Sequence, residues 1–148
     1  MRHPLRTLLL VFGLATTLSV ALLCGTPASA ATSSLEWAML SKVNATRTAY
    51  GLRALPMRAD LNYFARKQSL AMATRHALFH SNLSVICCYT LIGENVGYGP
   101  TLTRVHLAFL ASPSHRANIL DRRWGGAGIG VASSGGYLWV TEIFRAPY

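Results

Sequence analysis

The chain has 148 residues, of which 51% are hydrophobic and 13% charged, and its formal net charge is +9. This length supplies one domain with a modest core, which excludes a multidomain organisation. The positive charge favours anionic surfaces such as lipid headgroups or acidic wall polymers. The basic residues are not interleaved with aromatic ones as in a nucleic-acid module, so no specific nucleic-acid partner is expected.

The N-terminal 30 residues have the pattern of a secretory signal peptide. A basic start precedes a long apolar run, and the segment ends in Ala28-Ser29-Ala30, which predicts cleavage after Ala30. An uncut membrane anchor is the alternative, and Cys24 is a weaker candidate for lipidation because Leu23 precedes it. We therefore expect a secreted chain with one domain over residues 31–148, without a membrane span after cleavage. Loss of the two arginines of the signal leaves 12 basic against 5 acidic residues.

Two cysteines follow the predicted cleavage point, and they are neighbours, Cys87 and Cys88. Adjacent cysteines close only a small strained ring, so they do not staple a fold as distant pairs do. Free buried thiols, a vicinal disulfide and one half of an intermolecular bridge all remain open.

Helical patterns occupy the first half of the domain. A capping-box pair, Ser33 and Glu36, predicts the start of a helix that stops near Gly51. An extended link at Leu55 leads to a second helix, for which Asp60 is the expected cap, and this helix runs towards residue 76. A long loop through residue 100 is expected next.

In the second half of the domain, the spacing of apolar residues changes from helical to alternating. A helix is predicted from about Thr103 to Ala111 and ends before Pro113, and a short helix with Ser114 as its N-cap follows. Residues 127–133 and 136–144 alternate with period two around a Ser-Ser-Gly-Gly turn, which indicates an antiparallel hairpin. Helices first and a closing hairpin last predict an α+β fold.

Common catalytic motifs do not fit the chain. The three glycines around Glu94 have neither the spacing of a dinucleotide loop nor the Lys-Ser/Thr of a phosphate loop. His76 and His80 stand four residues apart, but Ala77 occupies the position where a zinc protease needs its glutamate. No nucleophile elbow is present, and the cysteine pair lacks a papain-type context.

A dispersed set of three residues remains, namely His80, Glu94 and His115. Each lies in a predicted loop or at the boundary of an element, where functional groups concentrate. Two imidazoles and one carboxylate can form an open site for a divalent metal ion or a general acid–base cluster. Spacing alone does not choose between these interpretations.

Five blocks in fixed order carry a resemblance to a known family. They are FHSN (79–82), GENVGYG (93–99), SPSHRANIL (112–120), GIGVA (128–132) and LWVTEIF (138–144). Together they resemble the CAP superfamily of cysteine-rich secretory proteins, antigen 5 and pathogenesis-related proteins, in its compact bacterial SCP-like branch. The resemblance covers residues 35–144 and implies an α-β-α sandwich with a central cleft.

In that family two histidines and two glutamates face the cleft and can bind a divalent cation. By resemblance His80, Glu94 and His115 match three of the four, with Ser114 in place of the usual glycine before His115. The stretch that should carry the second glutamate, residues 108–113, has no acidic residue. Glu142 is the candidate replacement, with an outward strand position as its alternative, and His106 is a further auxiliary candidate. Asn118 is expected to hydrogen-bond the backbone of a neighbouring loop.

The expected function is a secreted binding module. Its cleft would hold a divalent cation (zinc, magnesium or calcium) and a lipid or cell-envelope ligand. Two alternatives stay open: an extracellular interaction protein whose cleft is vestigial, and a metal-assisted hydrolase acting on peptide or glycosidic bonds. The glycosidase version requires Glu94 and Glu142 to face the same cleft. Catalytic activity and oligomeric state remain open.

Overall fold

The computed structural model describes residues 28–147. Five helices and three strands follow one another along the chain: α1 (Ala28–Ala49), α2 (Ala59–Arg75), η1 (Leu83–Val85), β1 (Ile92–Gly99), α3 (Leu102–Ala111), α4 (Pro113–Leu120), β2 (Gly126–Ser134) and β3 (Tyr137–Arg145). The α+β class is confirmed. The predicted signal peptide lies almost entirely outside the described residues.

The strands form one antiparallel sheet in the order β1-β3-β2. The expected hairpin is confirmed, and its turn is made by Gly135 and Gly136, which both have positive φ. The expectation of a loop through residue 100 is wrong in part, because residues 92–99 form edge strand β1 along β3. A glycine-rich strand lacks the β-branched residues that make strands recognisable, and this one gains its stability from pairing with β3.

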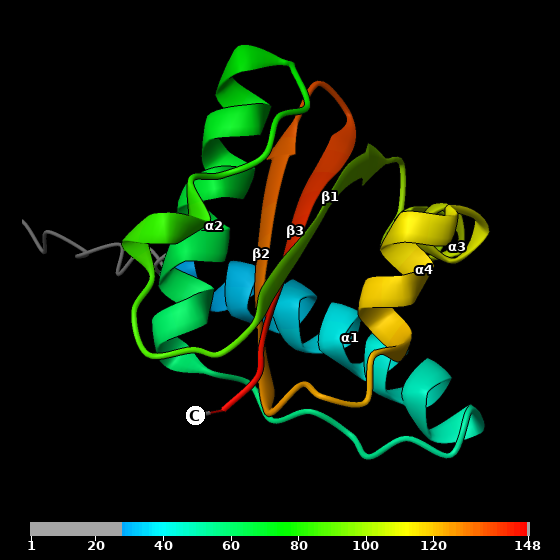
Figure 1. Cartoon of the computed structure of the whole chain (residues 1–148). Coiled ribbons are helices and arrows are strands. Elements are labelled where there is room, and N and C mark those ends of the chain that lie inside the picture. The colour runs from blue at the N-terminus through cyan, green and yellow to red at the C-terminus, as the bar shows by residue number, and fades with distance from the viewer. Residues whose placement is uncertain (1–27, 148) are drawn as a thin grey trace, which may run out of the picture.

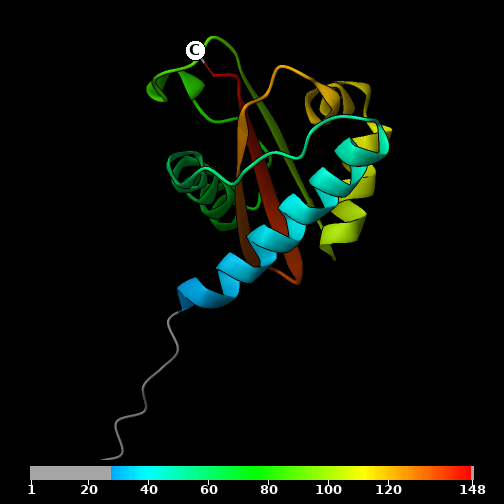
Figure 2. The same ribbon diagram turned by 90° about the horizontal axis from the view of Figure 1, so that it is seen from below.

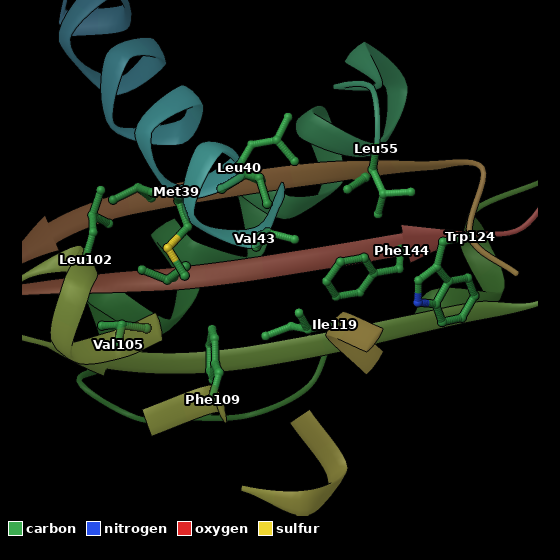
Figure 3. Close-up of a cluster of buried hydrophobic side chains, with 14 of the residues drawn as sticks. Met39, Leu40, Val43, Leu55, Leu102, Val105, Phe109, Ile119, Trp124 and Phe144 are labelled. Carbon is green, nitrogen blue, oxygen red and sulfur yellow. The ribbon is translucent and has the colours of Figure 1, made fainter. Parts of the chain in front are cut away.

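Helices cover both faces of the sheet. Figure 1 shows α2 on one side and α3 and α4 on the other, and Figure 2 shows α1 running across the sheet on the side of α4. The larger core lies between the sheet and α1, α3 and α4 (Figure 3), and it is built around Met39, Val43, Val105, Phe109, Ile119, Trp124 and Phe144. The predicted α-β-α sandwich is therefore confirmed.

The opposite face of the sheet allows a close approach of α2. A Cβ atom added at Gly128 would lie 2.3 Å from the backbone carbon of Leu61, and one added at Gly130 would lie 2.1 Å from the carbonyl oxygen of Ala65. Because these distances exclude any larger side chain, the alternate glycines of β2 let the helix backbone rest directly on the strand.

Two buried charged residues link helices to one another. The sequence analysis did not predict this structural role for either residue. Glu36 is only 1% exposed and accepts hydrogen bonds from Arg66, with 2.6 Å between Nε and Oε1. Arg47 is fully buried and donates to the carbonyl oxygens of Ile119 (2.7 Å) and Asp121 (2.9 Å), at the C-terminal end of α4. Burial is the main cause that lowers the pKa of Arg47 below its ordinary value.

Helix starts differ from the sequence expectations. The first helix begins at Ala28 and not at the capping box, and the carboxylate of Glu36 pairs with Arg66 of α2. Asp60 lies in the first turn of α2 and pairs with Arg145 at 2.6 Å, while Arg58 is the N-cap. Ser112 rather than Ser114 is the N-cap of α4. In each of these cases the capping assignment failed. The carboxylates of Glu36 and Asp60 instead pair with arginines that are distant in sequence, Arg66 and Arg145.

Between residues 28 and 147, no helix has the length and apolar character needed to cross a bilayer.

Candidate functional site

His80 and Glu94 form a direct pair beside edge strand β1. The Nδ1 of His80 lies 2.7 Å from Oε1 of Glu94. His80 follows the C-terminal end of α2, and its side chain is 63% exposed, whereas the side chain of Glu94 is 2% exposed. The exposed imidazole is thus attached to a buried carboxylate, and hydrogen bonding through Nδ1 leaves the Nε2 edge of the ring as its other coordinating position.

Glu94 is held by a second residue of the same loop. Its Oε1 also accepts from the backbone N–H of Ser81 at 3.0 Å, and its Oε2 accepts from the hydroxyl of Ser81. Both carboxylate oxygens are therefore engaged by protein donors. This arrangement fits a carboxylate that orients an imidazole better than one that binds a metal ion directly.

His115 approaches from the other side of β1, on α4. Its ring meets the ring of Phe109 edge-on, with 5.0 Å between centroids. Burial and, secondarily, the charge of His80 lower the pKa of His115 below its ordinary value. The charge of His80 thus acts on His115 although the two histidines are 35 residues apart in sequence, and both causes favour the neutral form of the His115 imidazole.

Two asparagines hold α4 against β1, and they complete the surroundings of the three residues. Asn118 donates from Nδ2 to the carbonyl oxygen of Glu94 (3.2 Å) and to Oδ1 of Asn95 (2.9 Å). The first of these is the expected hydrogen bond to the backbone of a neighbouring segment. Asn95 donates in turn to the carbonyl oxygen of His115 at 3.1 Å. Sequence reasoning missed Asn95, although its position directly after Glu94 in a short conspicuous block was the available signal.

Glu142 lies on the opposite face of the sheet from the Glu94 side chain. In the register of β1 and β3 it pairs with Asn95, while Glu94 pairs with Ile143, and neighbouring strand residues point to opposite faces. Glu142 is fully buried, so the alternative of an outward position is wrong. Its Oε2 accepts from Asn95 at 2.9 Å, whereas Oε1 has no hydrogen-bond partner in the structure. Burial raises the pKa of Glu142 to about 8.

The position of Glu142 affects two expectations, namely that it replaces the missing second glutamate and that it forms a glycosidase pair with Glu94. Glu142 reaches the three candidate residues only through Asn95 and does not supply a fourth carboxylate beside Glu94. The glycosidase alternative needs both carboxyl groups at one cleft, and these two lie on opposite faces.

His106 does not join the three residues either. It is buried on α3, and its Nε2 lies 2.8 Å from the hydroxyl of Thr46 on α1. Burial is the main cause that lowers the pKa of His106, with a contribution from Lys42. His106 therefore links two helices on the core side of the molecule.

The cysteine pair lies on the loop that leads into β1. Cys87 and Cys88 are both free and exposed, which excludes the expectation of buried thiols. Cys88 has a φ of 66°, in the left-handed region, so the chain turns sharply at the pair.

The side chains of His80, Glu94 and His115 differ in how well they suit different metal ions. Among the residues the structure describes, no group of three or more His, Cys, Asp or Glu side chains is arranged to hold a metal ion. His80 and His115 offer two imidazoles, which suit zinc and similar transition metals. Magnesium and calcium prefer oxygen ligands, and both oxygens of Glu94 are already engaged. The nitrogen donors that remain available here are those of the imidazoles, because the carboxylate oxygens of Glu94 are engaged by protein donors.

Solved structures share this fold. An outer surface protein from Borrelia burgdorferi matches with a TM-score of 0.68 at 17% identity, over 76% of this chain and 92% of that one. An extracellular protein from Bacillus anthracis that contains an SCP domain matches with a TM-score of 0.66 at 20% identity, over 78% and 41%. A cysteine-rich secretory protein from Staphylococcus aureus matches with 0.62 at 25% identity, over 78% and 39%.

The present chain thus spans about two fifths of the length of the last two proteins and nearly all of the first. The comparison with curated proteins gave no match. The family model described as the cysteine-rich secretory protein family matches residues 40–144, from α1 to β3. The chain belongs to this family, the CAP family.

Proposed function

We propose that the chain is an extracellular binding module. His80 and His115 bind a transition-metal ion such as zinc, and the metal takes part in holding a lipid or cell-envelope ligand. The hydrogen bond between Nδ1 of His80 and Oε1 of Glu94 carries this proposal, because metal-binding histidines almost always donate their other ring N–H to such an acceptor.

The architecture around the pair supports the same function. Ser81 fixes the carboxylate, and the chain Asn118–Asn95 fixes α4 and thus the backbone of His115. Open coordination positions at a two-histidine site leave room for a ligand atom or water.

Secretion belongs to the proposal as well. The N-terminal signal pattern and the extracellular, surface or secretory descriptions of the similar proteins support it. The positive charge of the domain would hold it near anionic lipids or acidic wall polymers at moderate ionic strength.

Zinc titration by calorimetry tests the metal site. The chain from residue 31 should bind zinc, and the double variant His80→Ala/His115→Ala should lose that binding while it keeps its thermal stability in chelator. The double variant His76→Ala/His106→Gln is the matched control, because it removes two histidines outside the site and should retain zinc binding. Zinc binding that is equal in the His80/His115 variant and the wild type would refute the assignment.

A further inference from the structure

A cavity of about 430 Å³ lies at the end of the sheet away from the chain's C-terminus. It is lined by His76, Leu78, Tyr98, Gly135, Tyr137 and Trp139. Figure 1 shows why these residues meet, since the C-terminal end of α2 and the β2–β3 turn lie together at the top of the view. None of the functions considered so far uses this cavity.

Three aromatic rings define one wall of the cavity. Tyr98 stacks on its cross-strand partner Trp139, with 4.7 Å between ring centroids and 17° between planes. Tyr137 stands at 77° to Tyr98, with 5.4 Å between centroids. Trp139 is 4% exposed, whereas Tyr98 and Tyr137 are 49% and 44% exposed. A buried indole therefore supports two exposed phenol rings, which makes a braced aromatic surface.

His76 forms the facing side. It occupies the C-cap of α2 with a φ of 49°, a conformation in which glycine is the usual residue. Its ring meets Trp139 edge-on at 6.2 Å. A Cβ atom added at Gly135 would lie 3.6 Å from Cε1 of His76, so the glycine turn passes close to the imidazole.

The chemistry of this lining selects a class of ligand. None of the lining residues is Lys, Arg, Asp or Glu, so the cavity offers no permanently charged partner for a phosphate or carboxylate. The same lining carries two phenol hydroxyls and an imidazole, to which a hydrocarbon chain offers no hydrogen-bond partner. A neutral sugar ring matches both features, because its C–H face packs on an aromatic ring while its hydroxyls pair with the polar groups at the edge.

The position of the cavity relates it to His80 and Glu94. Glu94, Val96 and Tyr98 lie on one face of β1, and the strand rises about 13 Å over the four steps from Glu94 to Tyr98. Half-buried Phe79, the residue before His80, packs against the buried cluster of Met72, Ala73, Val96 and Trp139. A polymer bound at Tyr98 can therefore continue over Phe79 towards His80.

We propose that this cavity is a subsite for a sugar ring of an extended, neutral envelope glycan that runs along β1 towards His80. The inference rests on the proposed function, for which it names the class of envelope ligand. The cavity lining does not include His80 or His115, so binding of a sugar in the cavity and binding of zinc by these histidines can be measured separately.

An NMR titration with chitotetraose, a soluble neutral sugar oligomer, tests the subsite. The signals of Tyr98, Tyr137 and the Trp139 indole should shift, with a Kd of about 1 mM or tighter. Tyr137→Ala should weaken binding at least tenfold, and Tyr98→Leu should do the same. Tyr63→Ala removes an exposed tyrosine of α2 outside the cavity and should bind like the wild type.

The variant His80→Ala/His115→Ala separates the two proposals, because it should lose zinc yet still show shifts at Tyr98 and Tyr137. In a parallel titration, vesicles of anionic phospholipid replace chitotetraose and test a lipid as the alternative ligand. Absent shifts at the cavity, equal binding by Tyr137→Ala, or shifts of the same signals with vesicles but not with chitotetraose would each overturn the subsite. Zinc binding by the wild type would stand in any of these cases.

Discussion

Nδ1 of His80 and Oε1 of Glu94 lie 2.7 Å apart, although the two residues are 14 positions apart in the chain. The loop after α2 carries the histidine and edge strand β1 carries the carboxylate, so the pair exists only when the two elements are packed together. Because the carboxylate is buried and the imidazole is exposed, Glu94 fixes the orientation of an imidazole that faces solvent.

Replacement of this carboxylate should weaken the metal site without removing it. Glu94→Gln retains the shape of the side chain but loses the charge that orients and polarises His80. We expect zinc affinity to fall about 10- to 100-fold in calorimetric titrations. Glu142→Gln is the matched control, since it changes a buried glutamate on the other face of the sheet and should bind zinc like the wild type. Equal affinities for all three proteins would contradict the orienting role.

The buried carboxyl of Glu142 should make stability depend on pH. Its pKa is raised from 4.5 to about 8 on folding, so the folded state holds a proton that the unfolded state releases between these values. The free energy of unfolding of the wild type should therefore fall as the pH rises from about 5 to about 8. Glu142→Gln should lack this loss and exceed the wild type by on the order of 3 kcal/mol at the upper pH.

Urea unfolding at both pH values measures the effect. The two proteins should be closest in stability at the lower pH, where Glu142 is protonated in the folded state. A difference that is independent of pH would show that Glu142 does not titrate on unfolding.

His115 should titrate in a way that reports on His80. Burial and then the charge of His80 lower its pKa, so His80→Ala removes the second cause and should raise the pKa of His115 towards, but not up to, its ordinary value. Two-dimensional NMR of the imidazole signals, recorded in chelator, measures the pKa of His115 in the wild type and in His80→Ala. A His115 pKa that is the same in the two proteins would mean that the histidines do not interact.

Arg47 should be important for stability rather than for binding. Arg47→Ala leaves the buried carbonyl oxygens of Ile119 and Asp121 without their donor, and it also opens space beside α4. We expect a loss of about 3–4 kcal/mol in the free energy of unfolding. Arg116→Ala, which removes an exposed arginine hydrogen-bonded to Tyr50, should cost no more than about 0.5 kcal/mol. Similar losses for both variants would be contrary to this assignment.

The cysteine pair should react in the folded protein. Both thiols are exposed and free, so iodoacetamide should add to Cys87 and Cys88 in the native chain from residue 31 without unfolding it. A hydrogen bond with Cys87 is the main cause that raises the pKa of Cys88, so modification of Cys88 should be the slower at neutral pH. Peptide mass spectrometry over time distinguishes the two sites, and protection of both thiols would contradict their exposure.

Local sequence patterns indicated much of the fold. The apolar periodicity of residues 102–111 and the alternation around Gly135 and Gly136 gave α3 and the β2–β3 hairpin, because these elements depend on neighbouring residues. Edge strand β1 was missed because a run with Gly93, Gly97 and Gly99 has no strand pattern of its own. Its hydrogen bonds with β3 stabilise it, and the sequence does not display that pairing.

The candidate site divides in the same way. The chemical types of His80, Glu94 and His115, and their place in ordered blocks, are properties of the sequence and sufficed to select them. Which oxygen of Glu94 meets which nitrogen of His80, and the separation of Glu142 onto the other face, depend on register and packing. The sequence thus determined which groups the protein carries, whereas tertiary structure alone decided which of them meet, because strand register and burial arise from contacts between segments distant in the chain.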